Sequence, residues 1–326
     1  MGRWSSLGLP RHRFERGLHE IGPGLHAWLQ PDGSWGWSNA GLVVDGEASL
    51  LVDTLFDLRL TQAMLDAMRR ALPHATRRIG RVVNTHANGD HCYGNALVEG
   101  AEIVASKAAA EEMAHMPASV LAAFAAGLGQ EDSDLGRFVK RAFGPFAFDE
   151  VGETKRPTRT FERALSLRVG DRAIDLFEVG PAHTRGDVIV HVPDARAVFT
   201  GDIVFCEGTP IVWDGPVANW IAACDRILAL APEVVVPGHG PITDRRGVEA
   251  MRAYFVWLTG EARARFESGQ DALAAARDIA LGEFGDWSDP ERIVVNVDTL
   301  YREFGAPPAP PDPLRLLRAM GEYGRR

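Results

Sequence analysis

The most informative feature of this sequence is a short run of metal-capable side chains at residues 85–91, which reads THANGDH. It follows the strand-like residues 81–84, RVVN, where a β-strand is expected to give way to a loop. Side chains at alternating positions of an extended chain point to one side, so His86, Asn88 and Asp90 can converge. Imidazole nitrogen and carboxylate oxygen are donors that zinc prefers in proteins. The run, which ends on His91, therefore predicts part of a metal site.

Three later segments also place a His or an Asp at the end of an apolar run. They read PAHTRGD around His183, TGD around Asp202 and PGHG around His239. Glycines beside these residues suit the tight turns that let several loops approach one point. Four separate strand ends that deliver such side chains to one place predict a metal centre.

In the type and order of these residues, the chain resembles the metallo-β-lactamase fold superfamily. The family signature is His-x-His-x-Asp-His, followed by a lone His, a bridging Asp and a last His. The matching residues, which lie within roughly residues 26–245, are His86, Asp90, His91, His183, Asp202 and His239. Asn88 departs from the signature, because the family usually has His at that position. The fold that the resemblance implies is α/β, a four-layer αββα sandwich.

The resemblance also implies two metal-binding groups that share the carboxylate of Asp202. The side chains of these groups are His86, His183 and Asn88 in the first, and Asp90, His91 and His239 in the second. A metal-bound hydroxide would be the nucleophile, because metal binding lowers the pKa of water by many units. Asp90 and Asp202 are predicted to be catalytic residues as well as ligands.

Asn88 leaves the number and the identity of the metal ions open. An amide oxygen is neutral and a poor ligand for zinc, so the first group has one strong donor fewer. Either a second zinc binds weakly through His86, His183 and Asp202, or only the second group fills. The prediction is therefore one or two Zn²⁺ per chain. A harder metal, Mn²⁺ or Fe²⁺, is the alternative, since it tolerates an amide oxygen better.

The leading functional hypothesis is a metal-dependent hydrolase that cleaves an ester-like bond of a small molecule: a lactone, a thioester or a β-lactam. An alternative is an iron- or manganese-dependent lyase, cyclase or oxygenase of secondary metabolism on the same fold. A second alternative is a non-catalytic metal-binding member. The retained Asp202 and the intact Asp90-His91 pair argue against this last reading, because a purely structural site needs no open coordination position.

Composition restricts the class of protein. A hydrophobic fraction of 46% and a charged fraction of 24% are typical of soluble globular proteins. A net charge of −9 argues against nucleic acid or an anionic membrane as a partner. No stretch reads as a signal peptide or a membrane span, and three scattered cysteines do not form a disulfide framework. These features predict a cytoplasmic protein.

Apolar spacing divides the chain into three parts. Residues 1–25 are predicted to be an irregular arm, residues 26–245 the metallo-β-lactamase-like domain, and residues 246–326 a C-terminal helical extension. Residues 106–147 interrupt the strand–helix alternation and predict a helical insertion, which either packs against the fold or roofs the metal site. The C-terminal helices are candidates for a homodimer interface or for a wall of the pocket.

Four residues near the predicted ligands receive other roles. Asp53 ends a strand and resembles an Asp that, in the family, supports the metal loops by hydrogen bonding. Trp213 and Phe205, which follow Asp202, are candidate apolar walls of the pocket. Tyr93 is a candidate hydrogen-bond donor to a substrate.

Overall fold

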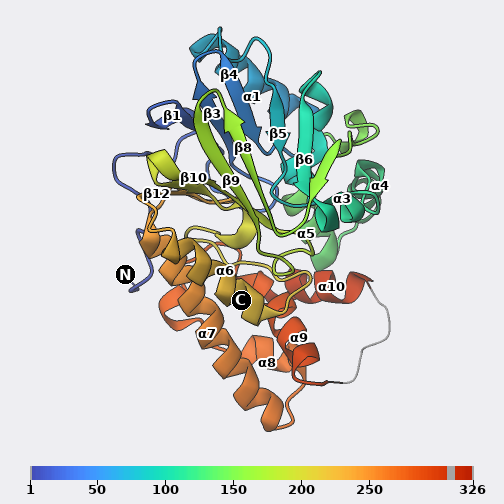
Figure 1. Cartoon of the computed structure of the whole chain (residues 1–326). Coiled ribbons are helices and arrows are strands. Elements are labelled where there is room, and N and C mark those ends of the chain that lie inside the picture. Colours follow the sequence, from blue (N-terminus) through green and yellow to red (C-terminus); the bar gives the residue numbers. More distant parts are fainter. Residues whose placement is uncertain (1, 307–312, 325–326) are drawn as a thin grey trace.

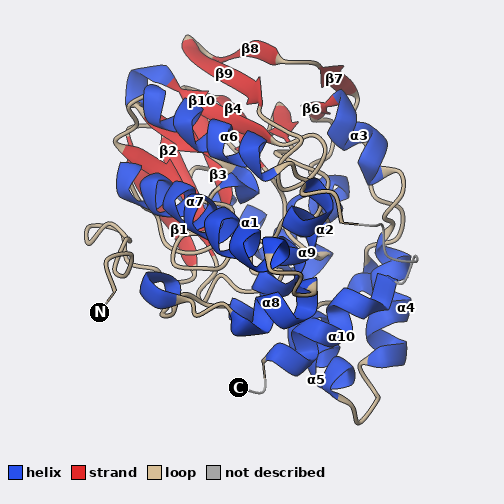
Figure 2. Ribbon diagram, turned by 90° about the horizontal axis from the view of Figure 1, so that it is seen from below, coloured by secondary structure: helices blue, strands red, loops and turns tan. Residues whose placement is uncertain are grey.

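Two β-sheets packed face to face, with helices on both outer sides, make up the body of the molecule in a computed structural model (Figure 1, Figure 2). The structure describes residues 2–306 and 313–324. The α/β class and the four-layer αββα sandwich predicted from the sequence are confirmed. Within the described residues, no helix is both long enough and apolar enough to cross a membrane.

The first sheet has seven strands in the order β1-β2-β3-β4-β5-β6-β7. Their bounds are β1 (Gly17–Gly22), β2 (Leu25–Leu29), β3 (Ala40–Asp45), β4 (Ala48–Val52), β5 (Arg81–Val83), β6 (Glu102–Ser106) and β7 (Arg159–Phe161). Pairing is antiparallel from β1 to β4 and parallel from β4 to β7. Val52 pairs with Val83, so the segments after β4 and β5 emerge side by side.

The second sheet has five strands in the order β12-β11-β10-β9-β8. Their bounds are β8 (Ala164–Val169), β9 (Arg172–Glu178), β10 (Val188–Val192), β11 (Ala197–Phe199) and β12 (Val234–Val236). The last two strands are parallel, with Phe199 paired to Val236. The segments that carry Asp202 and His239 therefore leave the sheet at one edge.

Ten α-helices lie in the described part of the chain. Their bounds are α1 (Leu58–Ala71), α2 (Gly89–Cys92), α3 (Lys107–Met113), α4 (Ala118–Leu128), α5 (Asp134–Phe143), α6 (Val217–Ala229), α7 (Arg245–Glu267), α8 (Ala272–Asp278), α9 (Ile293–Glu303) and α10 (Pro313–Tyr323). The first begins where Asp57 accepts a hydrogen bond from the Leu60 amide, and it buries Met64 and Met68. This apolar face covers the outer side of the first sheet.

The alternation of side chains along β4 explains how the layers form. Leu50 and Val52 point into the core between the two sheets, whereas Leu51 packs towards α1. All three are at most 2% exposed. Successive strand residues point to opposite faces, so an unbroken apolar strand must be covered on both sides. The helices α6 and α7 cover the second sheet in the same way.

The structure differs from the expected irregular arm at residues 1–25, because Gly17–Gly22 forms β1. This strand lies at the sheet edge and pairs only with β2, so it needs just one buried residue, Ile21. Such a short, half-exposed strand has too weak an alternation to stand out in sequence. Within the predicted insertion lie α3, α4 and α5, and beyond residue 245 lie α7 to α10. The domain boundaries themselves stay predictions.

Candidate metal centre

The six predicted ligands come from five segments and meet at the edge where strands of both sheets end. His86 follows β5, Asp90 and His91 lie in α2, and His183 lies between β9 and β10. Asp202 follows β11 and His239 follows β12. All six side chains are buried. The two sheets therefore form the scaffold, and the loops and the short helix α2 at their ends carry the predicted ligands.

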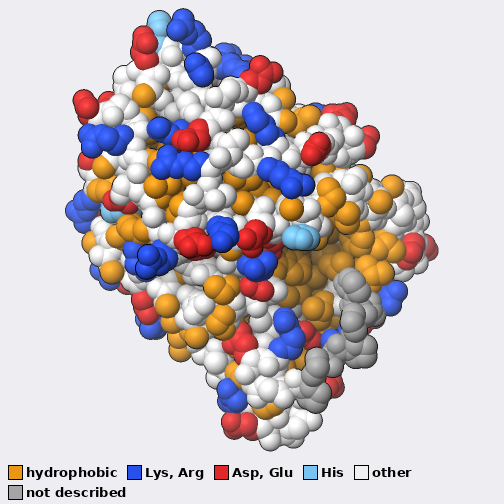
Figure 3. Space-filling view, turned by 45° about the vertical axis from the view of Figure 1, so that its right-hand side comes forward, with side chains coloured by type: hydrophobic (Ala, Val, Ile, Leu, Met, Phe, Trp, Pro, Cys, Tyr) orange, Lys and Arg blue, Asp and Glu red, His pale blue; other side chains and the backbone are white. Residues whose placement is uncertain are grey.

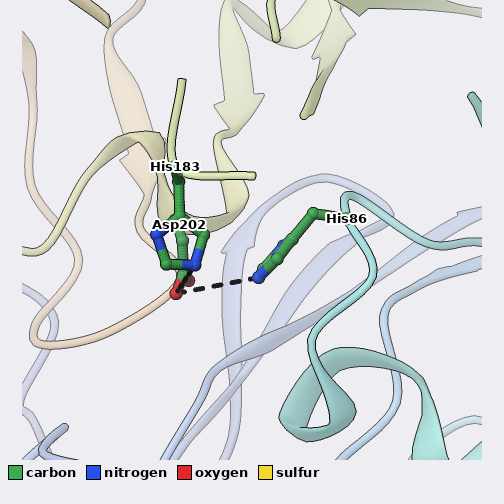
Figure 4. A group of neighbouring side chains, drawn as sticks. All are labelled: His86, His183 and Asp202. Carbon is green, nitrogen blue, oxygen red and sulfur yellow. Dashed lines mark ion pairs between the residues drawn. The ribbon is translucent and has the colours of Figure 1, made fainter. Parts of the chain in front are cut away.

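The first group comprises His86, His183 and Asp202, whose donor atoms lie within 4.8 Å of one another. The Nε2 atoms of His183 and His86 are 3.3 and 3.8 Å from Asp202 Oδ2. Figure 4 shows both imidazoles directed at this carboxylate. Two nitrogen donors and one oxygen donor thus converge from three separate loops.

The second group comprises Asp90, His91 and His239, again within 4.8 Å. His239 Nε2 lies 3.3 Å from Asp90 Oδ2 and 3.4 Å from Asp202 Oδ2. His91 Nε2 lies 3.1 Å from Asp202 Oδ1. Asp202 therefore contacts imidazoles of both groups, as the bridging residue implied by the resemblance would. The role of these residues as metal ligands stays a prediction.

Each of the four imidazoles is anchored through Nδ1, on the side away from the cluster. The anchors are the Thr85 hydroxyl 3.0 Å from His86, the Asp53 carboxylate 2.9 Å from His91, the Ile211 carbonyl 2.7 Å from His183 and the Gly33 carbonyl 3.1 Å from His239. Such contacts fix the ring orientation and leave Nε2 to face inward. Four rings oriented alike are a property of metal sites rather than of ordinary buried histidines.

Three buried atoms at the centre make no hydrogen bond: His86 Nε2, and also His91 Nε2 and Asp202 Oδ1, which lie 3.1 Å apart without hydrogen-bond geometry. Buried polar atoms are nearly always satisfied, because an unmade hydrogen bond costs free energy. A divalent cation accepts lone pairs from both imidazole and carboxylate and would satisfy all three atoms at once. The donor set therefore fits the metal that the resemblance implies.

Burial and neighbouring charges shift the pKa values of the clustered side chains strongly. Burial lowers the pKa of His86 well below its ordinary value, and the neighbouring His91 adds to the effect. Burial would also lower the pKa of His91, but Asp202 and Asp90 outweigh it and hold that pKa well above the ordinary value. Burial opposes ionisation of Asp202, but His239 and His91 hold the pKa of its carboxyl well below the usual range. A cation bound here must compete with protons.

Asn88 lies at the first group, with its Nδ2 atom 3.0 Å from His183 Nε2. It is half-buried and occupies the N-cap position of α2. The backbone thus brings the side chain at position 88 to the place where the family signature has a third imidazole. Whether its amide binds metal stays a prediction.

Asp53 supports the loops, as predicted. Its carboxylate accepts hydrogen bonds from the Thr85 amide and hydroxyl, both at 2.7 Å, and contacts His91 Nδ1. Its backbone has φ of +63°, a left-handed conformation that is costly for most residues. Strain of this kind persists only where surrounding contacts impose it. Asp53 therefore couples the His86 loop to α2.

We expect Asp53→Asn to lower metal affinity by about tenfold to 100-fold, since loss of an anchoring carboxylate weakens ligand orientation and basicity. Asn tolerates a positive φ, so the fold should persist. Affinity is measured by competition with a chromogenic chelator. Asp57→Asn is the matched control, because Asp57 is equally buried but caps α1. Equal affinities for the two variants would contradict the anchoring role.

The loop between β2 and β3 holds two supporting residues that the sequence did not reveal. Ser38 Oγ donates to the Asp90 carbonyl at 2.6 Å. Asn39 Nδ2 donates to the carbonyls of Pro237 and Gly240, at 3.0 and 2.8 Å, on both sides of His239. Neither residue has a spacing that marks it out, because both act through backbone carbonyls of distant segments.

Two candidate pocket residues have different roles in the structure. The Tyr93 hydroxyl donates to the Met116 carbonyl at 3.0 Å, and the ring is only 1% exposed, so it is not placed to contact a substrate. Phe205 stacks on the His239 ring at 5.1 Å and is buried, so it packs behind a predicted ligand. Trp213 is 39% exposed, and its amide donates to the His183 carbonyl. Trp213 therefore remains a candidate wall.

Comparison with known proteins places this geometry in context. Residues 33–239 match the family model described as the metallo-beta-lactamase superfamily. The human acyl-coenzyme A thioesterase MBLAC2 is 27% identical over 213 residues, which is 62% of this chain and 72% of that protein. A linear primary-alkylsulfatase of Pseudomonas sp. is 26% identical over 134 residues, which is 39% of this chain and 24% of that protein.

Among solved structures, the sec-alkylsulfatase Pisa1 from Pseudomonas sp. superposes with a TM-score of 0.67 and 17% identity. The match covers 90% of this chain and 52% of that one, so the chain spans about half the length of this neighbour. At this identity the likeness concerns the fold. The superposition covers 90% of this chain, which is more than residues 33–239, the part matched by the family model. The likeness in fold therefore extends beyond that part.

Proposed function

This chain belongs to the metallo-β-lactamase superfamily, and on that premise we propose that it is a zinc-dependent hydrolase that cleaves a thioester bond of a small molecule. The observation that carries the proposal is the double group of inward-facing donors that share Asp202, with three buried donor atoms left unsatisfied. A merely structural site would use one closed set of ligands. Two adjacent sets with a shared carboxylate suit hydrolysis.

The position of each predicted ligand indicates which ion it would hold. His86 and His183 would hold one ion, and Asp90, His91 and His239 the other, with Asp202 between them. When bound, the metal supplies a water of lowered pKa and polarises the substrate carbonyl. The anchored Nδ1 atoms keep the imidazoles from turning as charge develops, so little reorganisation is needed during the reaction.

Asp90 is the best-placed group to move a proton. Its side chain is 11% exposed, whereas that of His239 is 4% and that of Asp202 is 3% exposed. The Asp90 carboxylate is therefore more accessible to water than that of Asp202. We propose that Asp90 accepts a proton from the attacking water and returns it to the departing thiolate. The C–S bond breaks, and a carboxylic acid and a thiol are released.

A thioester is favoured over a lactone or a β-lactam by the relative that aligns over most of both chains, which is named as an acyl-coenzyme A thioesterase. A sulfate ester is the second candidate. It is favoured by the curated linear primary-alkylsulfatase, which aligns over 39% of this chain. Water would cleave both kinds of bond at the same site, and the two reactions would differ in the atom that water attacks.

We expect kcat/KM for an acyl-CoA to exceed that for a lactone, a β-lactam or an alkyl sulfate by about tenfold or more, since specificity follows differential transition-state binding. Thiol release from the acyl-CoA is followed with a disulfide reagent and loss of the other substrates by chromatography, on protein whose metal content has been measured by elemental analysis. Dialysis against a chelator should stop the reaction, and Zn²⁺ should restore it. A faster lactone reaction would overturn the choice of bond. Iron or manganese in the purified protein would favour the lyase or oxygenase reading.

A further inference from the structure

Helix α4 is uncharged, with Ser119 as its single polar side chain, and yet lies at the surface. Its eleven residues include no charged side chain, and only Ala118 is fully buried. Val120 and the preceding Met116 are each 49% exposed. Helices without a polar face are normally covered, and exposed apolar patches mark binding sites. Figure 3 shows hydrophobic side chains gathered in a hollow on the side where Figure 1 places α3, α4 and α5.

A row of aromatic rings connects this helix with the segment that carries His183. Trp213, whose amide donates to the His183 carbonyl, lies 6.4 Å from the ring of Trp35. Trp35 lies 6.1 Å from Phe143 at the end of α5, and Phe143 lies 5.7 Å from Phe124 of α4. Rings at these separations are in contact. A row of aromatic rings therefore runs from the backbone beside His183, through the largely buried Trp35, to α4.

A second contact fixes the start of α4 near the same centre. The hydroxyl of Tyr93, two residues after His91, donates to the Met116 carbonyl at 3.0 Å. Val120 and Phe124 are four residues apart and share one side of the helix, next to this start. The segment that leads into α4 is thus hydrogen-bonded to a residue close in sequence to a predicted ligand.

We propose that this surface, the α4 tail site, binds the linear hydrocarbon chain of the substrate while its scissile bond lies at the metal centre. The inference rests on the proposed function and deepens it, because it names a long-chain acyl group as the substrate. The continuity of the aromatic row with the His183 loop selects a substrate chain over a second copy of the protein or a membrane. An uncharged helix offers no ion pair to a charged headgroup, so we assign only the tail to this surface.

The tail site predicts a dependence on chain length. Each methylene removed from water contributes about 0.8 kcal/mol, roughly a fourfold gain in affinity. We expect kcat/KM for dodecanoyl-CoA to exceed that for butanoyl-CoA by at least about tenfold, allowing for incomplete burial of the chain. Val120→Asp should lower the dodecanoyl value by about tenfold, because a carboxylate is costly to desolvate. The butanoyl value should change less than about twofold, since a short chain does not reach α4.

Val256→Asp is the matched control. Val256 is 50% exposed in the middle of α7, which packs against α6, α8 and α9 rather than against α4. The same charge at an equally exposed valine should leave both kcat/KM values unchanged. Similar losses in the two variants would overturn the tail site, because the effect would then come from charge or stability alone.

Binding of a fluorescent long-chain fatty acid gives a readout independent of turnover. Weaker fatty acid binding in Val120→Asp but not in Val256→Asp supports the tail site. The same binding result without any thioester hydrolysis would retain the tail site and contradict only the proposed function. Thioester hydrolysis with no preference for long chains retains the proposed function and overturns the tail site. A change of oligomeric mass in Val120→Asp, with fatty acid binding intact, would assign α4 to self-association and overturn the inference.

Discussion

Replacement of Asp202 by Asn is expected to remove metal from both groups and to lower kcat/KM at least about 1,000-fold, equivalent to about 4 kcal/mol of transition-state stabilisation. The Asp202 carboxylate lies within 3.4 Å of His183, His91 and His239. A neutral amide of the same shape keeps the packing but removes the charge that two metal ions would share. Metal content by elemental analysis and hydrolysis of an acyl-CoA are the measurements.

Asp225→Asn serves as the control for this change. Its carboxylate is 53% exposed and pairs with Arg252 at 2.6 Å, a surface contact that contributes little to stability. Metal content and activity should therefore match those of the unaltered protein. Retention of two metal ions per chain by Asp202→Asn would contradict the bridging role. A loss of one ion only would assign Asp202 to a single group.

The positions of the predicted ligands could be read from the sequence because four of the six follow a strand, and Asp90 and His91 lie in the short helix α2 after β5. His86 leaves β5 and Asp202 leaves β11, both short and fully apolar near their ends. Such strands lie in the interior of a sheet, so their carboxyl ends are fixed by the ladder. The order of the motifs along the chain matches the family signature, and from this match the meeting of these strand ends could be inferred. Local pattern and global topology agree here, which is typical of a well-specified fold.

The supporting residues could not be found in this way. Asn39 holds the His239 loop through two backbone carbonyls almost 200 positions away in sequence. Any residue type can offer a carbonyl, so no motif on the partner segment records the contact. Asp53 was identifiable because it ends an apolar strand and resembles an Asp that supports the metal loops in the family. Its positive φ depends on the meeting of β4, β5 and α2, which is a tertiary property.

The role of α4 was open for a different reason. Its composition predicts a helix, which the structure confirms at Ala118–Leu128, but an apolar helix is normally read as core. Only the exposure of Val120 and the ring contacts of Phe124 distinguish a binding surface from a packed element. Both depend on where α5 and the Trp35 loop lie, and these are fixed by contacts far apart in the sequence.

Asn88→His is expected to raise the metal affinity of the first group on the order of 100-fold or more, since even removal of an outer hydrogen-bond partner changes affinity by about 10–100-fold. The amide of Asn88 lies 3.0 Å from His183 Nε2, at the side of the group that lacks a third imidazole. It is half-buried, so a larger ring has room towards solvent. Metal titration should change from one tight and one weak ion to two tight ions.

Asn88→Ala separates a weak ligand from a residue that does not bind metal. If the amide contributes nothing to coordination, Ala should leave the weak-site affinity within about threefold, because no donor to the metal is lost. A further loss of affinity would make Asn88 a true ligand. Two tight ions in the unaltered protein would contradict the prediction for Asn88→His, since the first group would then be complete without the imidazole. Reduced acyl-CoA hydrolysis in Asn88→His despite two tight ions would instead mean that the amide shapes the reaction, because metal loading and turnover would then respond in opposite directions.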